Sequence, residues 1–220
     1  MKAQKTPKEM VESYIEEMNN YDPDLQEMGA KYLSELVLKG QINLIEDPEL
    51  ARRITENFLK QVASQSFAVH SSAIRYLAEM VPKLPKNELL HIFHQTISAI
   101  ARVDTQSERR EIFSTSAGTM IHLAPDDFGH ALSDLFVESI NQLMNTQTKN
   151  TDIEMLLLNV ITEFTRKWPN VAGSSDVKFN RKGFIHHLLR NIETSHKLLL
   201  VRKSDGALGK VCLIFNRQNF

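Results

Sequence analysis

The strongest constraint on the fold is a ladder of apolar and small residues that recurs along the chain. In the stretch 108–125, Ile112, Ser116, Met120 and Leu123 are spaced by four, four and three positions, which places them on one stripe of an α-helix. Equivalent ladders occur before and after this stretch. The second members of the five ladders are Gly29, Ala73, Ser116, Leu157 and Ser204, which are separated by 44, 43, 41 and 47 residues. A period of about 40–47 residues with two helices per unit is typical of HEAT and armadillo arrays. The period therefore predicts an all-α HEAT-repeat superhelix, or solenoid, of about five helical hairpins.

Turn and capping signals divide the chain into these hairpins. Thr6-Pro7, Asp47-Pro48 and Pro125-Asp126 suit helix starts, and Trp168-Pro169 suits a helix end. Residues 170–177 read as the longest loop. We expect a single solenoid over residues 1–220, with repeats at approximately 6–39, 47–85, 86–124, 125–169 and 178–216.

Gly118 lies in the middle of a predicted helix, where glycine costs about 1 kcal/mol relative to alanine. Its neighbours Ser116 and Ala117 are also small. We expect a close approach of two helix backbones to explain this cluster.

Composition limits the classes of function. Hydrophobic residues make up 42% of the chain and charged residues 24%, as in proteins that bury a core. The net charge is -1 and no run of five like charges occurs, which argues against a general nucleic-acid or membrane-surface binder. The only cysteine, Cys212, excludes an intrachain disulfide and favours a reducing compartment, the cytoplasm or nucleus. No stretch approaches the ~18 consecutive apolar residues of a membrane span, so we expect no membrane partner.

Sequence motifs for chemistry are weak. His91 and His94 have a helical spacing that would suit two ligands of one metal ion, but no third ligand is indicated. The adjacent His186 and His187 point to different faces of a helix. No nucleophile elbow, phosphate-binding glycine loop or HExxH helix occurs. We therefore predict no catalytic residues, no metal site and no cofactor.

Adjacent pairs of basic residues are more informative about function than the histidines. Their simplest interpretation is solvated helix faces paired with nearby acids; for Arg52-Arg53 these include Glu49 and Glu56. Alternatively, those at the starts of the second helices form a ridge that suits a large acidic protein partner. This candidate partner-binding ridge comprises Arg75, Glu79, Arg109, Arg110, Arg202 and Lys203.

The last residues, VCLIFNRQNF, contain no polar capping helix. In a solenoid, Val211, Leu213, Ile214 and Phe215 would expose core surface. We expect further repeats or a second chain to cover this end.

Four segments resemble a known family in order and spacing. DPDLQEMGAKYLSEL, AVHSSAIRYLAEMVPKL, ERREIFSTSAGTMIHLAP and LLLVRKSDGALGKV are similar to the N-terminal HEAT repeats of the cullin-associated and neddylation-dissociated proteins. The resemblance implies a non-enzymatic scaffold that binds unneddylated cullin and the RING subunit of a cullin-RING ubiquitin ligase. In that family the solenoid regulates ligase assembly and exchange of substrate receptors, and this chain would correspond to the N-terminal arm.

The loop at 170–177 and the ending RQNF depart from the family pattern. The alternative is a generic HEAT protein-binding scaffold of the transport-receptor or phosphatase-scaffold type. Such a protein would share the periodicity and bind other partners.

Overall fold

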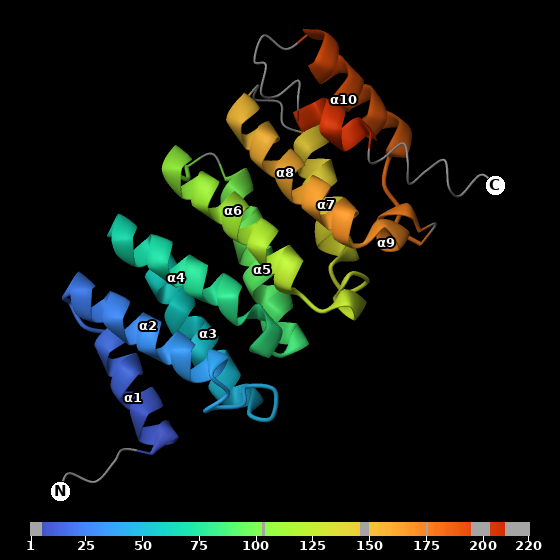
Figure 1. The fold of residues 1–220 in the computed structure, drawn as a ribbon. Helices are drawn as coiled ribbons and strands as arrows, with labels where there is room; N and C mark the ends of the chain where they lie inside the picture. Colours follow the sequence, from blue (N-terminus) through green and yellow to red (C-terminus); the bar gives the residue numbers. More distant parts are fainter. Residues whose placement is uncertain (1–5, 103, 146–149, 175, 195–202, 210–220) are drawn as a thin grey trace, which may run out of the picture. The chain divides into compact units, whose positions relative to one another are not determined.

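The computed structural model describes residues 6–102, 104–145, 150–174, 176–194 and 203–209, and within these ranges the chain is helical without β-strands (Figure 1). The all-α prediction is confirmed for this part of the chain. No helix in these ranges is long and apolar enough to cross a membrane. The chain divides into two compact units, residues 1–92 and 93–220. The single solenoid over residues 1–220 stays a prediction.

The N-terminal unit is built from two helical pairs. Within each pair the helices contact each other; between pairs the two first helices meet, and the two second helices meet. The first pair is α1 (Pro7–Met18) and α2 (Pro23–Leu38), and the second is α3 (Pro48–Val62) and α4 (Phe67–Met80), followed by the 3-10 helix η1 (Val81–Lys83).

Capping residues determine where these helices begin. The Thr6 side chain accepts a hydrogen bond from the Glu9 amide, and the Glu9 carboxylate accepts one from the Thr6 amide. Asp22 and Asp47 cap α2 and α3 immediately before a proline. Helix α2 begins at Pro23, because proline fits the first position of a helix.

The closest backbone approach in this unit lies between α1 and α2. A Cβ atom at Gly29 would stand 2.7 Å from the Tyr14 carbonyl oxygen and 2.9 Å from the Met18 amide nitrogen. Both are backbone atoms, so neither can move aside cheaply. Glycine is required here because the two helices pack at this point.

The C-terminal unit contains the remaining helices. The boundary between the units falls within α5 (Lys86–Ala101). In the C-terminal unit α8 contacts α6, α7 and α9, and α7 contacts α10. The elements that follow α5 are α6 (Ser107–Leu123), η2 (Asp126–Phe128), α7 (Ser133–Asn145), α8 (Thr151–Lys167), α9 (Pro169–Gly173) and α10 (Arg181–Thr194).

Two sequence predictions are wrong in this unit. Pro125-Asp126 does not begin a long helix but the short η2, and α7 starts only at Ser133. The reason is Phe128, which is fully buried and fixes the chain before α7. The predicted loop 170–177 is partly helical, because Pro169 begins α9 and Val171 and Ala172 are buried.

The explanation proposed for Gly118 is also wrong. A Cβ atom there would meet only the Glu163 Cγ, at an ordinary contact distance of 3.7 Å. Gly29, rather than Gly118, marks a close helix approach. Of the predicted last helix, 198–216, the structure describes residues 203–209, which are helical. The apolar segment 211–215 lies outside the described residues.

Hydrogen bonds join residues one repeat apart in both units. The bonds run between side chains, or from a side chain to a backbone carbonyl, at separations of 41 to 45 positions. Successive helical pairs therefore use equivalent positions for contact. The joined residues are Arg53 and Glu12, Gln61 and Met18, Ser72 and Glu27, Ser114 and Leu156, Lys167 and Ala124, Trp168 and Asp126, and Lys203 and Asn159.

Candidate protein-binding surface

A short pattern recurs on the two second helices of the N-terminal unit. Helix α2 carries KYLSE at 31–35 and α4 carries RYLAE at 75–79, so cation, tyrosine, leucine and acid occupy matching positions 44 residues apart. The leucines, Leu33 and Leu77, are fully buried. Since α2 packs against α4, the matching positions form parallel rows on two neighbouring helices.

The cations of this pattern face solvent. Lys31 and Arg75 are exposed, and Glu35 and Glu79 are half-buried. The Arg75 guanidinium carbon lies 4.9 Å from the ring centroid of Tyr76, a distance at which a cation is attracted to the ring face. We name Lys31, Tyr32, Glu35, Arg75 and Glu79 the α2–α4 face.

Exposed apolar side chains add to this face. Met28 and Tyr32, four residues apart on α2, expose 44% and 38% of their surface. The Tyr32 ring lies 5.5 Å from that of Tyr14, so its position is supported from α1. Methionine, tyrosine and arginine are enriched in the centres of protein interfaces. Among the described residues, six of the seven exposed large apolar side chains belong to the N-terminal unit: Tyr21, Met28, Tyr32, Leu38, Ile45 and Phe67.

The acid of α2 is charged at neutral pH. Glu35 accepts a hydrogen bond from Lys39 Nζ at 2.7 Å, and this bond and the charge of Lys39 lower the pKa of the Glu35 carboxyl. Lys31 lowers this pKa further by charge alone. The α2 part of the face therefore presents both signs of charge.

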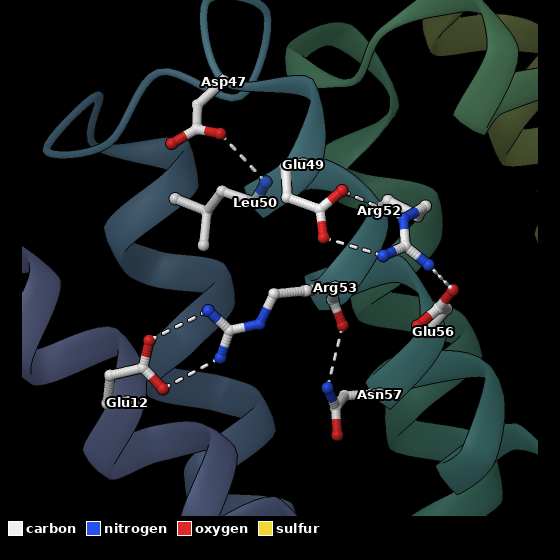
Figure 2. Close-up of polar contacts among 8 residues, drawn as sticks. All are labelled: Glu12, Asp47, Glu49, Leu50, Arg52, Arg53, Glu56 and Asn57. Atoms are coloured by element: carbon white, nitrogen blue, oxygen red, sulfur yellow. Dashed lines mark hydrogen bonds and ion pairs between the residues drawn. The ribbon is translucent and has the colours of Figure 1, made fainter.

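The first helices carry a different arrangement, in which charges pair within the unit (Figure 2). Arg53 on α3 donates to both oxygens of Glu12 on α1, at 3.0 and 2.9 Å. Arg52 pairs with Glu49 at 2.7 Å and with Glu56 at 2.6 Å. The pairing expected for Arg52 is confirmed, and the link from Arg53 to Glu12 adds a tie between the two helical pairs that the sequence did not indicate.

These arginines lower the pKa of their acids. The hydrogen bond from Arg53 holds the pKa of the Glu12 carboxyl below its usual value, and Arg52 does the same for Glu49. Because Arg52 and Arg53 are engaged by carboxylates of their own unit, the α3 face offers less free charge to a partner than the α2–α4 face.

Of the six residues in the predicted ridge, Arg75 and Glu79 fall on the α2–α4 face. Arg110 differs from the prediction: it is 6% exposed and donates to the carbonyl oxygens of Arg102 and Thr105. These hydrogen bonds stabilise the turn between α5 and α6. Because the Arg110 side chain is buried, its charge does not contribute to an exposed ridge. Arg109 is half-buried.

The remaining ridge residues lie at the end of the chain. Lys203 is half-buried and donates to the Asn159 side chain at 2.8 Å. Arg202 lies outside the described residues. Sequence reasoning selected basic pairs and missed Lys31, Tyr32 and Glu35, although the recurrence of KYLSE as RYLAE could have identified them.

Candidate metal ligands do not converge in the described ranges. His91 and His94 are both exposed on α5. Within the part of the chain that the structure describes, no three His, Cys, Asp or Glu side chains are grouped closely enough to hold a metal ion.

Comparison with known proteins adds evidence on the fold alone. No family model matches the sequence, and no curated protein matches it. A crystal structure of an engineered protein is similar over 92% of this chain, with 16% identity and a TM-score of 0.50. The chain spans 47% of that protein's length. A second engineered protein is 15% identical over 93% of this chain and 97% of its own length, with a TM-score of 0.46. At 16% identity the first likeness concerns the fold alone. The class, an all-helical protein over the described residues, follows from the structure itself.

Proposed function

We propose that this chain is a HEAT-type helical-repeat scaffold that binds a protein partner through the α2–α4 face and has no reaction centre. The recurrence of a cation and an acid at a 44-residue interval on two packed helices carries this proposal. Of the two matching tyrosines, Tyr32 is exposed and Tyr76 is buried. A solenoid turns equivalent positions of successive repeats into an extended binding surface. The exposed Met28 and Tyr32 supply apolar contact beside the charged rows.

The partner we propose is an unneddylated cullin with its RING subunit. Four segments of the chain resemble the N-terminal HEAT repeats of the cullin-associated and neddylation-dissociated proteins, and two of them contain the KYLSE and RYLAE patterns. By this proposal the chain acts as the N-terminal arm of a regulator of ligase assembly and receptor exchange. Its site of action would be the cytoplasm and nucleus.

The second candidate is a generic HEAT scaffold that binds another protein. This candidate needs only the helical periodicity and no particular partner. Both candidates use the same surface, so they differ in the partner and its state of modification.

Binding to purified cullin-RING pairs tests the proposal. We expect binding to the unmodified pair, and loss of binding when the cullin carries the ubiquitin-like modifier. Lys31→Glu and Arg75→Glu should each weaken binding at least about fivefold, because each reverses an exposed charge on the face. Lys60→Glu, which reverses an exposed cation on α3, is the matched control and should bind normally.

Binding to neither form would contradict the cullin proposal and leave the generic scaffold. Equal binding to both forms would contradict the dependence on modification. Equal weakening by all three substitutions would place the contact elsewhere than on the α2–α4 face.

A further inference from the structure

A hollow of about 550 Å³ lies in the C-terminal unit, apart from the α2–α4 face. One side is formed by Gly183, His186, His187 and Arg190, which lie on one side of α10 because they are spaced by three, one and three residues. The prediction that His186 and His187 point to different faces of their helix is therefore wrong, since both line this hollow. Met144 of α7 and Leu189 complete the lining. A volume of this size falls within the range of ligand sites.

His187 is the most buried member of the lining, with 7% of its surface exposed. Arg190 Nη2 lies 3.3 Å from His187 Nδ1. Arginine has only donors, so Nδ1 is the acceptor and the neutral ring carries its proton on Nε2. Nε2 is buried and has no hydrogen-bond partner among the described residues. A phosphate oxygen that reached this nitrogen would supply the missing acceptor.

All polar side chains of the lining can donate hydrogen bonds. The side chains of His186 and Arg190 are exposed. No carboxylate is among the lining residues that the structure describes. The carboxylate of Glu154 on α8 accepts a hydrogen bond of 3.4 Å from the Asn191 side chain. It also interacts with the charge of Arg190. Burial raises the pKa of the Glu154 carboxyl, and the charge of Arg190 opposes this shift.

The lining also selects the shape of the ligand. A guanidinium and two imidazoles supply three donor side chains, which suits the three terminal oxygens of a phosphate group. The hollow is larger than one phosphate, and Met144 and Leu189 make part of it apolar. The ligand therefore needs an organic part attached to its anion.

We propose that this hollow binds a phosphate monoester, with the phosphate at His186, His187 and Arg190 and the organic group against Met144 and Leu189. Burial, together with the charge of Arg190, lowers the pKa of the His187 imidazole. A phosphate close to the ring stabilises the imidazolium and raises that pKa. Binding and the protonation of His187 are therefore linked.

Phenyl phosphate is the probe, and histidine NMR resonances of the full chain are the readout. We expect saturable shifts of the His186 and His187 signals and an upward shift of the His187 pKa. Inorganic phosphate should bind at least about tenfold more weakly than phenyl phosphate, since it lacks the ring, and benzyl alcohol should not bind. A glycine-flanked phosphotyrosine peptide separates two sources of the group: its binding assigns the hollow to a phosphorylated side chain, and binding of phenyl phosphate alone assigns it to a small organic phosphate.

Substitutions outside the buried core keep the test independent of folding. Arg190→Gln and His186→Gln should each weaken phenyl phosphate binding about tenfold. Arg166→Gln, which removes an exposed cation paired with Glu163 on α8, should leave binding unchanged. Absence of saturable binding by both phenyl phosphate and the peptide, unaltered binding by Arg190→Gln, or equal binding of benzyl alcohol would each overturn the proposal.

Discussion

The two units treat their ionisable groups in opposite ways. In the N-terminal unit, Glu12, Glu35 and Glu49 have lowered pKa values because arginine or lysine partners donate to them at the surface. In the C-terminal unit, apart from the exposed Arg102–Asp104 pair, burial is the main cause: it raises the pKa of Glu154 and lowers those of Lys167 and His187. The N-terminal unit pairs these three acids at its surface, whereas the C-terminal unit buries these three ionisable groups at some cost.

The two units also differ in how their helices pack. The N-terminal unit joins α1 to α2 through the close backbone approach at Gly29. The C-terminal unit relies on aromatic rings: Phe164 is stacked on Phe136 at 4.4 Å and lies 5.1 Å from Trp168. Trp168 also donates to the Asp126 carbonyl at 2.8 Å, so one side chain fixes both α8 and η2.

The largest expected effect is therefore at Trp168. Trp168→Ala should lower the free energy of unfolding of the C-terminal unit by about 3–5 kcal/mol, because it removes a side chain that is 5% exposed and leaves a cavity. Chemical denaturation followed by circular dichroism measures this change. Trp168→Phe, which keeps much of the ring packing and loses the hydrogen bond, should cost less. A loss below about 1 kcal/mol for Trp168→Ala would refute the central role of the ring.

Next in size is Gly29 in the N-terminal unit. Gly29→Ala should destabilise the protein by about 1–3 kcal/mol, because the new methyl group would stand 2.7 Å from the Tyr14 carbonyl oxygen and force α1 away from α2. Thermal or chemical denaturation measures the loss. A stabilised variant would show that α1 moves aside without cost.

Gly118 in the C-terminal unit should respond in the opposite direction. Gly118→Ala should raise the free energy of unfolding by up to about 1 kcal/mol, because the methyl group finds ordinary contact and the helix gains an alanine. The same denaturation experiment, run beside Gly29→Ala, checks the sign. Destabilisation comparable to that at Gly29 would mean that α6 is packed more tightly at this point than the 3.7 Å contact indicates.

These two glycines show what sequence could and could not predict. Periodicity and caps identified the helices, and α1 and α3 begin at the prolines of the predicted start signals, Pro7 and Pro48, because both signals are local. Whether a glycine permits close packing depends on the neighbouring helix, and only the structure identifies Gly29. Arg110 failed as a surface candidate for the same reason, since its partners are carbonyl groups of the preceding turn.

The stretch before α7 failed because of a tertiary contact. Pro125-Asp126 is a good local start signal, but burial of Phe128 and the approach of Trp168 to Gly129 hold the chain in η2 instead. The α2–α4 face was recoverable from sequence, since its pattern repeats in the letters. Its exposure was not, because the burial of Leu33 and Leu77 sets which way the flanking side chains face.

A smaller effect, dependent on pH, distinguishes the buried acid of the C-terminal unit. The folded-state pKa of Glu154 lies above 4.5, so its contribution to stability is present below that pH and is lost as pH rises through the folded pKa. Glu154→Gln should therefore become more favourable, relative to the unsubstituted protein, as pH rises from 4 to 7. Denaturation midpoints across this range test the trend, and a constant difference would contradict it.

The surface pair of the N-terminal unit should show the reverse trend and the smallest size. Arg53 lowers the pKa of Glu12 below 4.5, so the stability it contributes is present above that pH and is lost as pH falls through the folded pKa. Both side chains are 40–47% exposed, and solvent limits such a pair to about 0.2–1 kcal/mol. Glu12→Gln should cost that much at pH 7 and nothing near pH 2, with Glu16→Gln, on the same helix, as the control.

Added salt sharpens the contrast between Glu12 and Glu154. Raising the ionic strength to 1 M should remove most of the Glu12→Gln effect, because the pair is open to solvent. It should change the Glu154→Gln effect less, because burial is its main cause. If salt reduced both effects equally, surface charge would determine the effect of both substitutions on stability. The proposed difference between paired surface acids in one unit and a buried acid in the other would then be wrong.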